Sequence, residues 1–251
     1  MFSSKKNKSK NEVLGVIPAR GGSKGLPRKN IKELLGKPLI VWSIDEVKRS
    51  KLITRTIVLT DDEEIAEIAK KAGAEVPYIQ PVEVSTDTSG DVEYLTYALD
   101  WLQKNENYTP DIILRLPPTS PLRTATHIDE GIKTLLENTE ADASRPIVEV
   151  DKHPYKMWKI VEDGPYIEPF LSKDFTGMDE PYNKQRQLFP KVYSHTGAMD
   201  VICLATLVEQ RSTSGKKLAY FFMKPEDSIN IDSQMDFDIA ELYLQKRLQN
   251  N

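Results

Sequence analysis

The chain has 251 residues, 39% of them hydrophobic and 29% charged, a composition typical of a folded globular protein rather than a disordered or fibrous one. Its 34 lysines and arginines stand against 38 acidic residues, and a net charge of −4 provides no overall basic surface for nucleic acid or an anionic membrane. The single cysteine, Cys203, excludes an intrachain disulfide, and every apolar run is too short to span a bilayer. We therefore expect a cytoplasmic protein without nucleic-acid or membrane partners.

The first eleven residues are polar, rich in lysine and without periodicity, which predicts a disordered tail over residues 1–11. The apolar stretch that follows, Val13–Ile17, is too short for a secretion signal and runs directly into Pro18 and Arg20. We therefore expect the folded domain to begin near residue 12.

Short apolar runs alternate with helical patterns through the first half of the chain. The runs are Val13–Pro18, Thr56–Thr60, Glu75–Ile79 and Ile112–Leu116. Because they are mostly continuous rather than alternating, they predict strands that are buried on both faces of a mainly parallel sheet. Helices are expected after Pro38, after an N-cap at Asp61, and over Val92–Lys104 and Ala125–Glu137. This alternation predicts a three-layer α/β/α fold.

The pattern changes in the second half. Residues 145–195 are rich in proline and aromatic residues, which indicates an insertion of loops and short strands whose aromatic side chains form a subunit interface or line a sugar. Strands are expected again at 196–204, 218–223 and 228–231. A final amphipathic helix should bury Phe237, Ala240, Tyr243, Leu244 and Leu248. The expected organisation is a catalytic domain of residues 12–144 and 196–251, interrupted by an inserted region of residues 145–195.

The loop after the first strand carries the strongest chemical signal. Its sequence from Ala19 to Asn30 contains the glycines Gly21, Gly22 and Gly25 and, among its cations, Arg20, Lys24 and Lys29. Parallel sheets bind ligands at the carboxyl ends of their strands. Glycines can take positive φ and direct backbone N–H groups at an anion, while the cations can bind phosphate oxygens. The spacing fits neither a Walker A loop nor a dinucleotide fingerprint, and a surface turn with incidental cations is the alternative.

The same loop resembles the signature of a known family. The run Ile17-Pro-Ala-Arg20-x-x-Ser23-Lys24-Gly25-Leu26-Pro27-x-Lys29-Asn30 is similar to that of the acylneuraminate (CMP-sialic acid synthetase-like) cytidylyltransferases. Three further motifs follow in the expected order over residues 13–245: Pro118-Thr-Ser-Pro-Leu-Arg123, His153-Pro154-x-Lys156 and Ser228-Ile-Asn-Ile-Asp232-x-x-x-Asp236.

The resemblance implies a Rossmann-like nucleotidyltransferase fold with a small dimerisation excursion, acting as a homodimer. It implies that CTP and a small acidic sugar, a sialic-acid-like nonulosonic acid, give a CMP-sugar and pyrophosphate with Mg²⁺ as cofactor. The nucleotide-binding positions carried over are Ala19, Arg20, Gly21, Gly22, Ser23, Lys24, Lys29, Asn30 and Gln80, with Arg20 and Lys24 as the catalytic pair that holds the triphosphate. Arg123, Lys156 and Arg186 match positions on the sugar side, and Asp232 with Asn230 matches the metal site.

The chain departs from the family pattern at four positions that face ligands. Asn230 replaces an aspartate of the metal site, Pro117 a glutamine and Thr196 an asparagine, and Gln80 stands where the family often has arginine. The phosphate half of the site is intact, so the departures concern the substrate more than the reaction. They favour a sugar acid other than N-acetylneuraminate, such as a legionaminic or pseudaminic type.

Three other functions remain as alternatives. A nucleotidyltransferase that joins another nucleoside triphosphate to a sugar phosphate is suggested by Gln80 and Pro117. A glycosyltransferase is disfavoured because Ile112–Arg123 contains no Asp-x-Asp motif, and a catalytically weak nucleotide-binding protein is suggested by Asn230.

Several candidate residues also have structural explanations. Arg123 can cap the following helix or pair with an acid instead of binding substrate. The three histidines, His127, His153 and His195, lack metal-ligand spacing, so structural roles are expected for them. Asp236 lies at a predicted helix start, where its negative charge interacts favourably with the helix dipole. It can also support the metal site.

Overall fold

The computed structural model describes residues 11–22, 25–84, 90–162 and 164–249. The predicted tail, apart from Asn11, lies outside these residues, as do Ser23 and Lys24 of the predicted phosphate loop. The chain divides into two compact units: unit 1 contains Met1–Ile147 and His195–Asn251, and unit 2 contains Val148–Ser194. The predicted insertion, residues 145–195, includes unit 2 and a few flanking residues.

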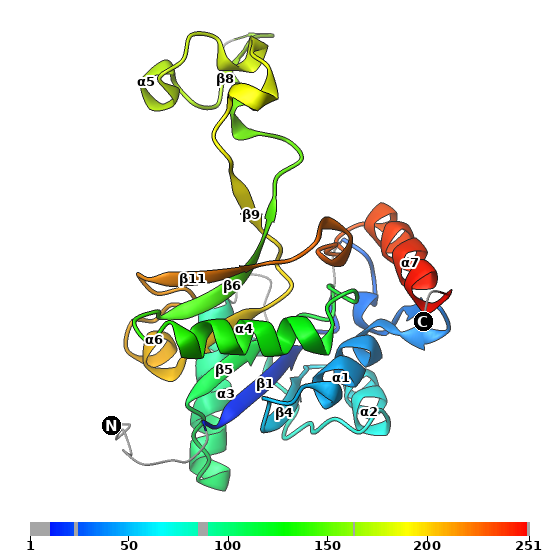
Figure 1. Ribbon diagram of the computed structural model, residues 1–251. Helices are drawn as coiled ribbons and strands as arrows, with labels where there is room; N and C mark the ends of the chain where they lie inside the picture. The colour runs from blue at the N-terminus through cyan, green and yellow to red at the C-terminus, as the bar shows by residue number, and fades with distance from the viewer. Residues whose placement is uncertain (1–10, 23–24, 85–89, 163, 250–251) are drawn as a thin grey trace. The chain divides into compact units, whose positions relative to one another are not determined.

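A seven-stranded sheet forms the centre of the described part of unit 1 (Figure 1). The strands in spatial order are β11 (Leu218–Phe222), β6 (Ala143–Glu149), β10 (Asp200–Cys203), β5 (Ile112–Arg115), β1 (Val13–Pro18) and β4 (Arg55–Leu59), and β9 (Tyr193–His195) pairs with β6. Strand β1 is parallel to both β4 and β5, and β11 is parallel to β6. Strand β10 runs antiparallel between β5 and β6, and the hydrogen bonds Val150–Val192 and Thr196–Pro146 make the β9–β6 pair antiparallel too, so the sheet is mixed.

Helices cover both faces of this sheet. On one face lie α1 (Leu39–Arg49), α2 (Glu63–Lys71) and α4 (Ala125–Glu137), whose apolar side chains share a core with Val13, Ile17 and Leu114. On the other lie α3 (Asp91–Glu106) and α6 (Leu204–Val208), packed against Leu14, Val16 and Ile113. Alternate residues of β1 and β5 thus enter opposite cores, as the pleat requires. The predicted three-layer α/β fold is confirmed.

A third apolar cluster anchors the C-terminal helix α7 (Gln234–Gln249) and the hairpin of β2 (Glu33–Leu34) and β3 (Lys37–Pro38). Phe237, Ala240 and Leu244 are buried at three- and four-residue spacing. Tyr243 and Leu248 were expected on the same side, but both are exposed. The buried stripe is therefore narrower than the sequence predicts. The remaining short helices of unit 1 are η1 (Lys29–Ile31), η2 (Val82–Val84) and η6 (Pro225–Asp227).

Two predicted strands are wrong. Glu75–Ile79 makes isolated bridges from Glu75 to Ile57 and from Ile79 to Thr60, but no continuous ladder. Pro77 lacks the N–H group that a ladder needs. Residues 228–231 also form no strand. The predicted strand at 196–204 is interrupted by a turn at Gly197, whose φ of 72° separates β9 from β10.

Unit 2 contains one antiparallel hairpin and several single-turn helices. They are β7 (Trp158–Ile160), β8 (Ile167–Pro169), η3 (Pro154–Lys156), α5 (Lys173–Thr176), η4 (Pro181–Asn183) and η5 (Arg186–Leu188). Its exposed apolar side chains include Ile160, Tyr166, Phe170 and Phe175. Across both units, no described helix has the length and apolar character needed to cross a bilayer.

Arg123 holds together the loops at the carboxyl edge of the sheet. Its side chain is 1% exposed and donates hydrogen bonds to the carbonyl oxygens of Pro117 (3.1 Å) and Ala198 and to the Ser43 hydroxyl (2.8 Å). Thr124, not Arg123, caps α4. Burial lowers the pKa of Arg123 to about 9, so the guanidinium still carries its proton at neutral pH. This position differs from the predicted substrate contact, because both terminal amino groups already bind protein atoms.

We expect Arg123→Ala to lower the free energy of unfolding by about 3 kcal/mol, because two buried carbonyl groups lose their donor and the side-chain space is left empty. Urea denaturation measures the change. Arg49→Ala is the matched control, since that side chain is 69% exposed on α1 and should change stability by less than about 0.5 kcal/mol. Equal effects of the two substitutions would contradict the bridging role.

Candidate functional site

The predicted phosphate loop begins where β1 leaves the carboxyl edge of the sheet. The Ala19 N–H group donates to the Leu59 carbonyl at 2.8 Å, so the loop starts directly beside the end of β4. The loop closes with η1, where the Asn30 amide donates to the Arg20 carbonyl at 2.9 Å. Asn30 is buried, and its donor group therefore closes the loop, leaving the amide oxygen for other partners.

Acidic residues after β4 hold one side of the loop. The Gly21 N–H group donates to Asp61 Oδ1 at 2.8 Å. A Cβ atom on Gly21 would lie 2.6 Å from Asp62 Oδ2, so a larger residue would force the Asp62 side chain to move. The Arg28 guanidinium pairs with the carboxylates of Asp62 and Glu64, and its hydrogen bond holds the pKa of Asp62 below the usual range.

The predicted N-cap at Asp61 is wrong. Asp62 accepts the Ile65 N–H at 3.0 Å and caps α2, whose first residue is Glu63. The helix therefore begins one residue later than the Asp61–Glu64 pattern predicts. The Asp61 carboxylate does not cap the helix and lies beside Gly21 instead. Sequence analysis missed this contact, although an acid directly after a buried parallel strand is a signal for it.

The other side of the loop is held from a segment about 200 residues away. Lys29 Nζ donates to the Ile231 carbonyl at 2.5 Å and lies 3.2 Å from Asp232 Oδ1. A Cβ atom on Gly25 would lie 2.5 Å from the Asp232 carbonyl oxygen. Two motifs that are remote in sequence, the loop and the segment ending at Asp232, therefore lie in direct contact.

The glycines act through close approach rather than through positive φ. Neither Gly21 nor Gly22 adopts the left-handed conformation that the sequence analysis expected, whereas Arg28 does, with φ of 56°. Among the described residues, its chain neighbours aside, no atom lies within 4 Å of the place that a Cβ of Gly22 would occupy.

The two predicted metal ligands are adjacent. The Asn230 amide donates to Asp232 Oδ2 at 2.7 Å, and the Asp232 side chain is 72% exposed. Asp236 accepts from the N–H groups of Asp232 (3.1 Å) and Ser233 (2.8 Å), so it fixes the start of α7. Among the described residues, no three histidine, cysteine, aspartate or glutamate side chains gather as a metal cluster.

Gln80 offers a spare hydrogen-bond donor. Its backbone N–H group donates to the Thr60 carbonyl at 2.8 Å, which places the residue just past the end of β4. The side chain is buried, and its Nε2 atom has no hydrogen-bond partner among the described residues. A buried amide of this kind needs a partner, and a ligand oxygen or nitrogen would satisfy it.

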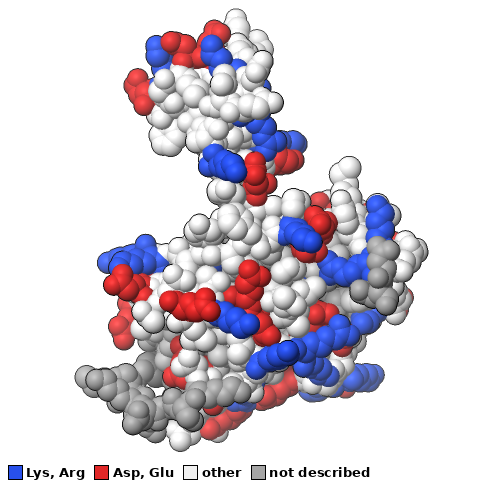
Figure 2. Space-filling model, in the orientation of Figure 1, with Lys and Arg blue, Asp and Glu red and all other residues white. Residues whose placement is uncertain are grey.

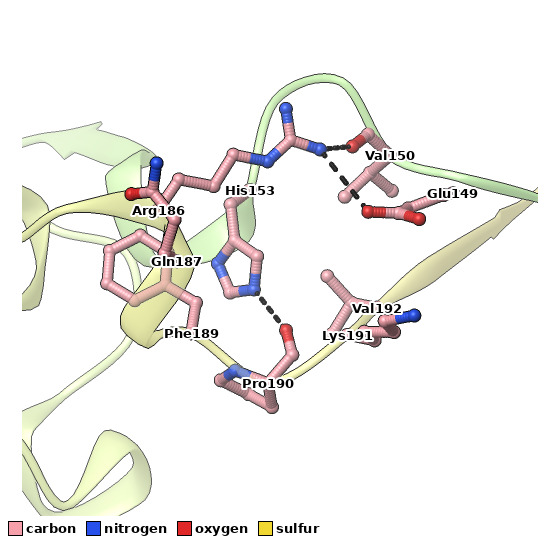
Figure 3. A pocket seen from close by; sticks show the side chains of 9 residues that line it. All are labelled: Glu149, Val150, His153, Arg186, Gln187, Phe189, Pro190, Lys191 and Val192. Carbon is pink, nitrogen blue, oxygen red and sulfur yellow. Dashed lines mark hydrogen bonds and ion pairs between the residues drawn. The ribbon is translucent and has the colours of Figure 1, made fainter.

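Lys156 and Arg186, predicted on the sugar side, both belong to unit 2. Arg186 donates to the carbonyls of Val150 and Asp151 and lines a cavity of about 280 Å³ (Figure 3). In the same cavity His153 Nε2 lies 3.0 Å from the Pro190 carbonyl, in keeping with its expected structural role. Lys156 Nζ lies 5.9 Å from the centre of the neighbouring Phe189 ring.

The surface of the protein carries both basic and acidic side chains. On the face shown in Figure 2, acidic side chains lie among the basic ones. This agrees with the expectation from the net charge of −4 that the protein has no overall basic surface.

Comparison with known proteins shows a family relationship. A family model described as cytidylyltransferase matches residues 14–200, more than half of the chain. Post-translational flagellin modification protein B of Campylobacter coli is 30% identical over 240 residues, which cover 94% of this chain and 97% of that protein. CMP-N,N'-diacetyllegionaminic acid synthase of Legionella pneumophila is 28% identical and covers 91% of this chain and 94% of its own length.

Some relatives are longer. N-acylneuraminate cytidylyltransferase of Escherichia coli is 29% identical over 95% of this chain, which spans 53% of that protein. The solved structure of CMP:2-keto-3-deoxy-manno-octonic acid synthetase complexed with CTP has a TM-score of 0.67 at 14% identity, covering 94% of this chain and 99% of that one, and shows the shared fold. Because the family model spans most of the fold described above, this chain belongs to the cytidylyltransferase family.

Proposed function

We propose that this protein transfers CMP from CTP to the anomeric hydroxyl of a sialic-acid-like nonulosonic acid and releases pyrophosphate. The observation that carries the proposal is the contact between the cationic loop and the segment ending at Asp232, with Lys29 bound to both Ile231 and Asp232. Relatives whose names specify N-acylneuraminate or diacetyllegionaminic acid support this substrate class.

In the proposed reaction the sugar hydroxyl oxygen forms a bond to the α-phosphorus, the bond to the β-phosphate oxygen breaks, and the hydroxyl proton is released. Such a transfer needs positioning and charge stabilisation more than covalent participation by the protein. In this reaction Arg20 and Lys29 would supply positive charge beside the triphosphate. The spare Nε2 donor of Gln80 lies on the β4 side and can bind an acceptor of the base.

The donor set beside the loop fits Mg²⁺. Asp232 presents an exposed carboxylate and Asn230 an amide oxygen, and Mg²⁺ binds through one or two such groups together with substrate phosphates and water. When bound there, the ion would neutralise charge on the triphosphate. Replacement of an aspartate by Asn230 lowers the local negative charge, so we expect weaker metal binding than two carboxylates would give.

Unit 2 supplies the proposed acceptor-side cations, Lys156 and Arg186, and a homodimer interface. Its exposed aromatic and aliphatic side chains, among them Ile160 and Phe175, support an association surface. Arg186 can pair with a carboxylate, because planar guanidinium groups bind carboxylates in a bidentate manner.

A direct substrate test is pyrophosphate release with each of four nucleoside triphosphates against a panel of nonulosonic acids and sugar phosphates. We expect turnover with CTP and at least one nonulosonic acid, and little with N-acetylneuraminate because Pro117 and Thr196 replace the family's polar side chains. Turnover with UTP or GTP and a sugar phosphate would favour the alternative nucleotidyltransferase activity.

We expect Lys29→Ala to lower kcat/KM by about 10²-fold, because a fixed positive charge beside the phosphates is lost. Lys32→Ala is the control, since that lysine binds Gln234 instead. Melting temperatures of both variants separate loss of the Ile231 contact from loss of chemistry. Activity of Lys29→Ala equal to that of the control would remove Lys29 from the site.

Metal titration tests the role of Asp232 and Asn230. Asp232→Asn should abolish magnesium-dependent turnover, whereas Asn230→Asp should lower the Mg²⁺ concentration that gives half-maximal activity, because a second carboxylate attracts the ion. If the wild-type protein is inert and Asn230→Asp restores activity, the protein is a weak nucleotide binder. An unchanged magnesium requirement in both variants would place the ion elsewhere.

A further inference from the structure

A charged cluster lies where strands β5, β10, β6 and β9 come together, apart from the loop after β1. Asp200, the first residue of β10, is 2% exposed and lies opposite Arg115, the last residue of β5, in the antiparallel register. Its carboxylate lies 3.1 Å from Arg115 Nη1, 2.5 Å from Arg145 Nε on β6 and 3.6 Å from His195 Nε2 on β9. Four strands thus contribute to one buried carboxylate.

Arg115 is fully committed to the protein. Its Nε atom lies 2.8 Å from Asp91 Oδ1 and 3.0 Å from the Tyr94 hydroxyl, which itself donates to Asp91 at 2.8 Å. Asp91 and Tyr94 on α3 and Asp200 on β10 therefore hold the Arg115 guanidinium between these two elements. Arg115 and Asp200 form the rigid part of the cluster.

Arg145 and His195 form its accessible part. Arg145 Nε forms an ion pair with Asp200 but lacks hydrogen-bond geometry, its Nη2 donates to the Thr213 hydroxyl at 3.1 Å, and its side chain is 20% exposed. The His195 side chain is 36% exposed. Burial lowers the pKa of His195, which favours the neutral imidazole with one donor and one acceptor nitrogen.

The position of the cluster along the sheet matches the acceptor side of the reaction. The phosphate loop follows β1, and Gln80 lies beyond β4, so the base side is on one flank of β1. Strands β5, β10 and β6 lie on the other flank. With neighbouring strands about 4.8 Å apart, β6 lies roughly 14 Å from β1 across the sheet. With the base placed beside Gln80 in the proposed function, this second flank is the side left for the sugar.

The turn after His195 connects the cluster to the metal-ligand position. A Cβ placed on Gly197 would lie 3.9 Å from the Cγ atom of Asn230. Thr196, between His195 and Gly197, replaces the asparagine that the family pattern has at this position. The cluster therefore adjoins a place where the chain departs from that pattern.

We infer that Arg145 and His195 contact an oxygen-bearing substituent of the sugar acid, an acyl carbonyl or a hydroxyl, and so help to select the sugar, with Asp200 and Arg115 as positioning residues. The inference rests on the proposed function. An interior charge network costs desolvation energy that apolar residues would avoid, and its exposed end presents the guanidinium donors of Arg145 beside an imidazole with one donor and one acceptor. A carbonyl or hydroxyl oxygen can accept from the guanidinium, and a hydroxyl can also pair with the imidazole.

The test measures KM for the sugar acid and for CTP separately, with the sugar acid that the wild-type protein uses best. Arg145→Met and His195→Phe should each raise KM for the sugar about 10- to 100-fold, as expected for loss of a hydrogen bond to a charged or polar donor, and leave KM for CTP within about twofold. His195→Gln retains an N–H donor and should recover most of the loss. Arg49→Met, at an exposed position on α1, is the matched control.

The outcomes separate the inference from the proposed function. If the wild-type protein uses no sugar acid with CTP, both fail. If it is active and the folded variants change KM for the sugar by less than twofold, or change KM for CTP equally, the cluster is structural and the inference is overturned. Should Arg145→Met fail to fold, the pair His195→Phe and His195→Gln decides, because His195 lies at the exposed end.

Discussion

The phosphate loop depends on being held from both sides by oppositely charged or carbonyl groups. On one side of the loop, Asp61 accepts from the Gly21 N–H group and Asp62 pairs with Arg28. On the other side, Lys29 donates to the Ile231 carbonyl and pairs with Asp232. A loop dense in cations would repel itself and sample many conformations. These acceptors fix the positions of Arg28 and Lys29 before a polyanion arrives, which reduces the reorganisation needed when charge develops in a transition state.

The same contacts create a competition. A phosphate oxygen that approaches Gly21 meets the Asp61 carboxylate already bound to that N–H group, and one that approaches Lys29 meets Asp232. Negative charge on the protein would weaken triphosphate binding unless a cation accompanies it. In the proposed function a divalent ion held by Asp232 would relieve this conflict, because it would offset the negative charge of the carboxylate. The loop geometry therefore supports the proposed metal requirement.

Local sequence signals predicted local structure well. The strand Val13–Pro18 and the helix Ala125–Glu137 occur with the predicted bounds, because continuous apolar runs and a threonine cap act within a few residues. Long-range contacts were not predictable in this way. Arg123 belongs to a motif that resembles a substrate-binding segment, yet its partners come from α1 and from the segment before β10. The contact of Asp61 with Gly21 likewise depends on the register of two strands 40 residues apart.

In the proposed function the arrangement of strands separates two kinds of recognition. The end of β1 carries the loop that resembles the family pattern for phosphate, whereas β5, β10 and β6 carry Arg115, Asp200 and Arg145. Parallel strands β1 and β5 present their carboxyl ends at one edge, and the antiparallel β10 presents its amino end there. Side chains from β10 can therefore change without altering the loop after β1, because the two share no direct ladder. On this sheet, selection of the acceptor can diverge while the nucleotide half keeps its geometry.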